Sequence, residues 1–87
     1  MIDRIFLRLS EGWALGFDKL QWMVMRRRKR REERYWQPVS FIASEKRILE
    51  RVLREMGAEV TPKGRAGIDS LRSTFREWLA QQNQAME

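Results

Sequence analysis

Apolar side chains recur at intervals of three and four residues through the first third of the chain, which is the period of an α-helix. Asp3 is a suitable acid for a first helical turn, and no proline occurs before Pro38. This pattern predicts one long helix over residues 3–34. Its apolar stripe consists of Ile2, Ile5, Phe6, Leu9, Trp13, Phe17, Leu20 and Val24.

The helical period is lost after this segment. Gln37 precedes a proline, and a residue in that position favours extended backbone. Residues 35–43 are therefore predicted to form an extended linker that is rich in aromatic side chains. A short strand over 39–42 that pairs with 58–60 is a minor alternative.

Two shorter helices are predicted in the second half of the chain. An amphipathic stripe that ends at Gly57 predicts a helix over 45–56, since glycine commonly follows a helix C-terminus. Thr61 before a proline is a helix-start signal and predicts a helix over 62–82. Residues 81–84 are all polar, and 83–87 are predicted to be a frayed tail.

The predicted fold is therefore mainly α, a small three-helix arrangement with a long N-terminal helix. A chain of 87 residues has room for one modest core, so 1–87 is predicted to be a single domain. The first helix is apolar on more than one side, because Leu15, Trp22 and Met25 lie off its main stripe. Either the other helices wrap around it, or these three side chains form an apolar face for a partner or for self-association.

Nearly all of the net charge lies in residues 26–34. This run holds seven cations and two anions, whereas the other 78 residues hold 11 cations and 10 anions. Unpaired cations are not buried in a core, because the desolvation of a charge is strongly unfavourable. The run is therefore predicted to be an exposed helix end that extends beyond the apolar stripe.

A concentrated positive charge favours a polyanionic partner. Arginine binds phosphate by bidentate hydrogen bonds as well as by charge, and the aromatic pair after the run could stack on unpaired bases. The preferred function is a small nucleic-acid-binding or accessory protein, with no motif that distinguishes RNA from DNA. The predicted contact residues are Arg26, Arg27, Arg28, Lys29, Arg30, Arg31, Arg34, Tyr35 and Trp36.

Other uses of the same charge stay open. Arg47, Arg51 and Arg54 form a candidate secondary basic face on the second predicted helix. A protein-interaction module is the main alternative: an adaptor, inhibitor or assembly subunit, of the kind that phages and mobile elements encode, docking on an acidic protein surface. A third alternative is a peripheral binder of anionic membrane surfaces. The run could also be only a solvated helix end.

The absence of certain residue types and motifs limits the reactions and metal sites that the chain could support. The chain has no histidine and no cysteine, which excludes imidazole catalysis and thiolate or imidazole zinc ligation. No phosphate-loop, dinucleotide or nucleophile-elbow motif occurs. We expect no enzyme, no catalytic residues, no metal and no cofactor. The lack of cysteine fits a cytoplasmic location, and no uninterrupted apolar run is long enough for a transmembrane helix.

Overall fold

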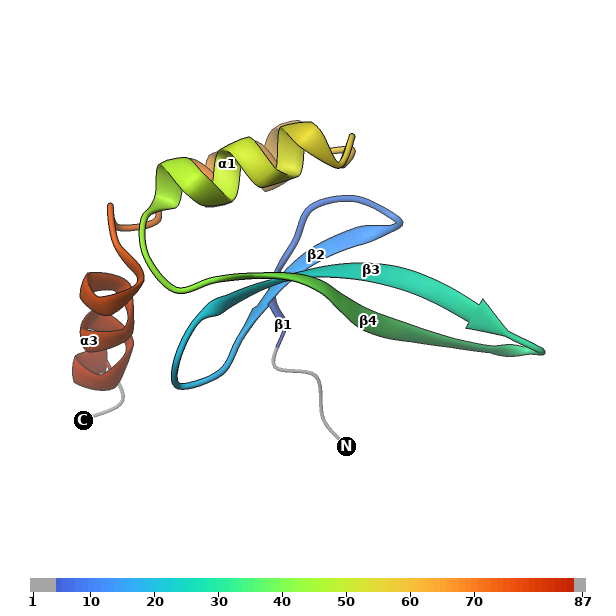
Figure 1. Cartoon of the computed structure of the whole chain (residues 1–87), viewed down its shortest axis with the longest axis horizontal. Coiled ribbons are helices and arrows are strands. Elements are labelled where there is room, and N and C mark those ends of the chain that lie inside the picture. The colour runs from blue at the N-terminus through green and yellow to red at the C-terminus, as the bar shows by residue number, and fades with distance from the viewer. Residues whose placement is uncertain (1–4, 86–87) are drawn as a thin grey trace.

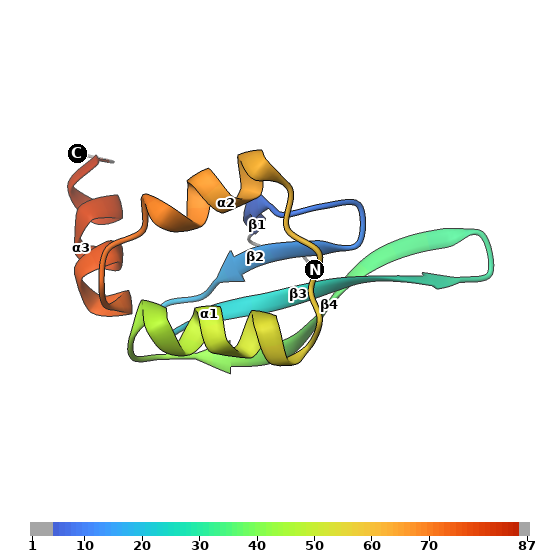
Figure 2. The ribbon, with the colours of Figure 1, turned by 90° about the horizontal axis from the view of Figure 1, so that it is seen from above.

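Four β-strands precede three α-helices in the computed structural model, which describes residues 5–85 (Figure 1). The elements are β1 (Ile5–Arg8), β2 (Trp13–Phe17), β3 (Trp22–Arg30), β4 (Glu33–Ile42), α1 (Lys46–Glu55), α2 (Pro62–Asp69) and α3 (Phe75–Ala85). The strands form one antiparallel sheet, in which each strand pairs with the next one along the chain. Helices α1 and α2 lie side by side over one face of the sheet, and α3 lies at one end of it (Figure 1, Figure 2).

The prediction of a mainly α fold is wrong, because the segment predicted as one long helix over 3–34 forms strands in its described part. Turns that reverse the chain separate the strands of this segment. After β1, the backbone N–H of Ser10 donates to the carbonyl of Trp13 at 3.1 Å. After β2, the Asp18 carboxylate accepts the backbone N–H of Leu20 at 2.8 Å, a local turn that aspartate favours. The first of these reversals contains Ser10 and Gly12, which favour turns, but the helical spacing of the apolar residues on either side predicted a continuous helix.

The strand register sorts the side chains onto two faces, since directly opposite residues in an antiparallel pair point to the same side. The helix-side face carries alternate residues of β2 and β3, such as Leu15 opposite Val24. The far face carries the residues between them, such as Ala14 opposite Met25. A β-bulge in β4 opposite Val24 and Met25 shifts this register before the two strands continue outward.

Aromatic side chains fill much of the core between the helix-side face and the helices. Trp22 is fully buried, and its ring centroid lies 5.5 Å from that of Phe75 and 6.0 Å from that of Trp78. Phe6 and Phe17 extend this cluster, with centroids 4.6 and 4.9 Å from that of Trp78. The aliphatic part of the core includes Leu9, Leu15, Val24, Ile42, Leu49, Leu53 and Ile68. Burial of each such large apolar side chain stabilises the fold by roughly 1.5–3 kcal/mol.

The helices of the second half were predicted more closely. The helix predicted over 45–56 corresponds to α1, and Gly57 follows it with a φ of +69°. The helix predicted over 62–82 is two helices, α2 and α3. Thr61 caps the first, since its hydroxyl accepts the N–H of Gly64 at 3.1 Å. The break between them contacts Lys46, whose backbone N–H donates to the carbonyl of Ser73 at 2.8 Å.

The predicted extended linker over 35–43 lies mostly within the longest strand. Residues 39–42 belong to β4, but they pair with β3, and 58–60 form no strand. The predicted frayed tail is helical through residue 85, and 86–87 lie outside the described residues. Within the described residues, no helix has the length and apolar character that a membrane crossing requires.

Candidate nucleic-acid interface

The basic run forms a β-hairpin arm instead of the predicted helix end. The arm comprises residues 26–37, and its strand partners run outward from Arg26 opposite Gln37 to Arg30 opposite Glu33. It projects beyond α1 and α2, on the side of the molecule away from α3 (Figure 1, Figure 2). Residues 28–35 are all exposed. The strands carry the charge away from the core, which avoids the cost of burying unpaired cations.

A two-residue turn closes the arm. Arg31 and Glu32 connect the strands, and Arg31 has a φ of +59°. Two-residue hairpin loops require a positive φ at the first central position, where glycine, asparagine and aspartate are preferred. An arginine at this position adopts a strained conformation. The sequence therefore lacked the residue signals by which such a hairpin is normally found.

The cations nearest the core already contact protein groups. Arg26 lies over the ring of Trp13, with its guanidinium carbon 5.1 Å from the ring centroid. Arg27 is 3.5 Å from the Glu11 carboxylate. Arg28 donates from Nε to Oε1 of Gln37 at 2.8 Å. The contacts of Arg26 and Arg27 join the base of the arm to the rest of the protein, whereas that of Arg28 joins the two strands of the arm.

The cations farther out are different. Within residues 5–85, no acidic side chain lies within 4 Å of the charged groups of Lys29, Arg30, Arg31 or Arg34. Lys29 and Arg34 are direct cross-strand partners. Like charges directly opposite each other destabilise a strand pair. We call these four residues the distal cations.

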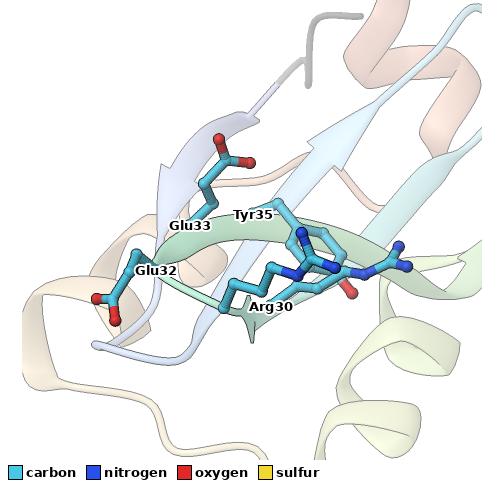
Figure 3. A pocket seen from close by; sticks show the side chains of 5 residues that line it. Arg30, Glu32, Glu33 and Tyr35 are labelled. Atoms are coloured by element: carbon cyan, nitrogen blue, oxygen red, sulfur yellow. The ribbon is translucent and has the colours of Figure 1, made fainter.

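The end of the arm is hollowed. Arg30, Arg31, Glu32, Glu33 and Tyr35 line an open depression of about 780 Å³. The carboxylates of Glu32 and Glu33 point away from the guanidinium of Arg30 (Figure 3). The two acids of the run therefore leave this arginine available to an external anion.

The two aromatic residues of the predicted site have different environments. Tyr35 is 45% exposed on the arm. Trp36 is half-buried on the far face, and two guanidinium carbons lie near its ring centroid, Arg27 at 5.4 Å and Arg8 at 5.3 Å. Cation–π contacts of this kind attract the guanidinium groups to the ring. Trp36 is therefore engaged within the protein, whereas Tyr35 is free to contact a partner.

The candidate secondary basic face lies apart from the arm, on α1 over the body of the sheet (Figure 2). Arg47 is 2.6 Å from the Glu45 carboxylate, and Arg51 is 3.9 Å from that of Glu55. Arg54 lines a hollow together with Glu50. Two of the three cations of this face thus have a carboxylate within 4 Å, in contrast to the distal cations.

Arg65 of α2 shows the same local neutralisation. Its guanidinium is 3.0 Å from the carboxylates of both Glu50 and Asp69. Slight burial acts to lower the pKa of Arg65, but the hydrogen bonds and charges of Asp69 and Glu50 outweigh it and hold the pKa above its ordinary value. Arg65 is therefore an internal partner of two acids and is not part of a free basic surface.

The three residues of the predicted apolar partner face are inside the protein. Leu15 and Trp22 lie in the core, and neither is exposed. Met25 is 1% exposed on the far face, opposite Ala14 and Pro38. None of these side chains is available to a partner in this conformation.

The arm also brings together residues that the sequence did not associate with it. Gln37 accepts a hydrogen bond from Arg28. Arg8 lies over the ring of Trp36, and Glu11 forms an ion pair with Arg27. Only the sheet register connects these positions, and the register was not predicted. Residues 5–85 contain no group of three or more acidic side chains that could hold a metal ion.

Comparisons with protein-family models, with curated proteins and with solved structures found no match for this chain.

Proposed function

We propose that this protein is a small, non-enzymatic nucleic-acid-binding protein that contacts phosphates through the distal cations of its arm. The observation that carries the proposal is the direct cross-strand pairing of Lys29 with Arg34. This pairing opposes strand formation when no anion is present. Phosphates placed near these two side chains would offset the repulsion between them.

The shape of the arm supports a large polyanion over an isolated anion. The distal cations lie on both faces and at the turn of a projecting hairpin, so no single small anion could contact all four. A nucleic acid presents phosphates along its whole length, and release of their counterions drives association with cations. We also infer a cytoplasmic location, where such a partner is accessible, since the chain lacks cysteine.

The alternatives have less support from the structure. Burial of Leu15, Trp22 and Met25 removes the apolar part of the binding face considered for the protein-interaction module, so that only the arginines remain for docking on an acidic protein surface. The membrane alternative depended on an amphipathic helix that ends in cations, and the described part of that segment is a sheet. Nucleic acid remains the partner that the exposed charge favours most.

The test is binding to duplex and single-stranded nucleic acids of unrelated sequence over a range of salt concentrations. We expect binding at about 50 mM salt that weakens steeply as salt rises, since each phosphate contact adds about 0.9 to the slope of log K against log salt for duplex DNA. The variant Lys29→Gln/Arg31→Gln/Arg34→Gln should reduce that slope by about 3.

A matched variant separates the arm from general charge. Arg47→Gln/Arg51→Gln/Arg54→Gln removes the same number of cations from α1 and should leave both the affinity and the slope nearly unchanged. Circular dichroism would confirm that both triple variants are folded. No binding at about 50 mM salt, or equal losses in the two variants, would refute the proposal.

A further inference from the structure

We infer that the arm binds double-stranded DNA in the major groove, with its helix-side face directed toward the base edges. This inference rests on the proposed function and specifies the class of nucleic acid. It depends on three features of the arm: its two-stranded form, the engagement of Trp36 and the unequal chemistry of its two faces.

The two-stranded structure of the arm favours a B-form DNA duplex as the partner. The major groove of B-DNA is about 12 Å wide and admits a two-stranded β-ribbon. The corresponding groove of an A-form RNA duplex is deep and too narrow for side chains to reach the bases. Since the arm projects beyond α1 and α2, it can enter a groove without the helices having to follow (Figure 1).

The aromatic residues argue against a single-stranded partner. Binding of single strands depends on free aromatic rings on which successive bases stack. Trp36 has guanidinium groups from Arg8 and Arg27 near its ring, and only Tyr35 is exposed on the arm. One ring does not make a stacking platform for successive bases.

The helix-side face of the arm has the chemistry of base recognition. It carries Arg26, Arg28 and Arg30 on β3, opposite Gln37, Tyr35 and Glu33 on β4. The hydrogen bond from Arg28 Nε to Gln37 Oε1 leaves the terminal guanidinium nitrogens of Arg28 and Nε2 of Gln37 for contacts with bases, and Oε1 keeps a second lone pair. Arginine binds guanine O6 and N7 in a bidentate manner, and glutamine pairs with adenine N6 and N7.

The far face has the chemistry of phosphate contact. In the outer part of the arm it carries Lys29 on β3 and Arg34 on β4. With the helix-side face on the groove floor, these two long side chains lie on neighbouring strands, each nearer to one of the two DNA backbones. Their mutual repulsion directs them apart, toward phosphates on opposite sides of the groove.

The first experiment compares affinities at equal salt for a DNA duplex, an RNA duplex and single strands of the same sequences. We expect the DNA duplex to bind at least tenfold more tightly than the others. Equal or tighter binding of RNA or of single strands would overturn the inference and leave the proposed function intact. Failure of every nucleic acid to bind would refute the proposed function itself.

The second experiment tests the assignment of faces by selecting binding sites from random DNA duplexes. Wild-type protein should enrich a sequence that contains guanine, and replacing its guanines by 7-deazaguanine should weaken binding about tenfold, because N7 is lost from the major groove. Arg28→Lys/Gln37→Ala should abolish the sequence preference while keeping the salt slope.

The converse variant is the control for the second experiment. Lys29→Gln/Arg34→Gln should lower affinity for all sequences alike, reduce the salt slope and preserve the sequence preference. Absence of any enriched sequence, or an enriched sequence that survives in Arg28→Lys/Gln37→Ala, would overturn the assignment of the helix-side face to the bases.

Discussion

Gly64 shows how one residue holds a helix against the sheet. A Cβ atom at this position would lie 2.9 Å from both Cα and the carbonyl oxygen of Leu9, so only glycine fits without movement. The same carbonyl accepts the backbone N–H of Thr61 at 2.9 Å. The backbone at the start of α2 therefore packs directly on the backbone of Leu9. This close approach requires glycine, although glycine has a low helix propensity.

Gly64→Ala should lower the free energy of unfolding by about 1–3 kcal/mol, because the added methyl group overpacks the contact with Leu9. Urea denaturation measures this change. Helix propensity alone would predict the opposite sign, a gain of up to about 1 kcal/mol. Gly12→Ala is the control, since a Cβ atom there would meet nothing within 4 Å. A more stable Gly64→Ala protein would contradict the packing argument.

At the scale of elements, the like charges on the two strands of the arm lower the stability of the protein. Lys29 and Arg34 repel each other across the strands. Arg34→Glu should therefore stabilise the protein by about 0.2–1 kcal/mol, since an opposite-charge pair replaces a like-charge pair. The same change should weaken nucleic-acid binding. Guanidinium denaturation would mask charge effects, so urea denaturation at low salt is the suitable measurement.

Arg34→Gln is the matched control for that prediction. It removes the repulsion without adding attraction, and its stability should fall between those of the wild type and Arg34→Glu. If Arg34→Glu is less stable than the wild type, the cross-strand repulsion is not a significant term in the stability of the arm.

The sequence predicted α1 well because its helical stripe, its charged outer side and the stop at Gly57 agree with one another. It failed for the strands, because short strands separated by turns can imitate a helical period. Trp13 and Phe17 share the helix-side face of β2 at a spacing of four, which also fits one face of a helix. Leu15 between them, at the spacing of two, was the sign of a strand.

The candidate site was partly predictable for a different reason. Exposure of residues 26–34 followed from the cost of burying charge, which does not depend on secondary structure. Their arrangement did not follow, because Arg31 closes the hairpin in a backbone conformation that arginine rarely adopts. The association of Arg28 with Gln37 depends on that closure, so it too required the structure.

At the scale of the whole molecule, the arm and the core are separate in space. The core cluster contains no residue of 26–37, and residues 28–35 are exposed. Arg27 and Trp36 are direct partners at the base of the arm. The arm can therefore be shortened there without any change to the packing between sheet and helices.

Replacing residues 28–35 by Asn-Gly should leave the free energy of unfolding within about 1 kcal/mol of the wild type, since exposed residues contribute little. The new turn suits a two-residue hairpin. Nucleic-acid binding should be lost. Thermal unfolding and a binding assay on the same preparation would check both outcomes. Loss of cooperative unfolding would show that the arm is needed for the fold.

The order of the elements along the chain has a consequence for synthesis. The four strands can pair as soon as Ile42 has emerged from the ribosome, because each pairs with its neighbour in sequence. The rings that cover Trp22 belong to α3, the last element. A nascent chain therefore holds a sheet with an uncovered indole until α3 appears. During that interval the positive charge of residues 26–34 causes nascent chains to repel one another, which opposes their aggregation.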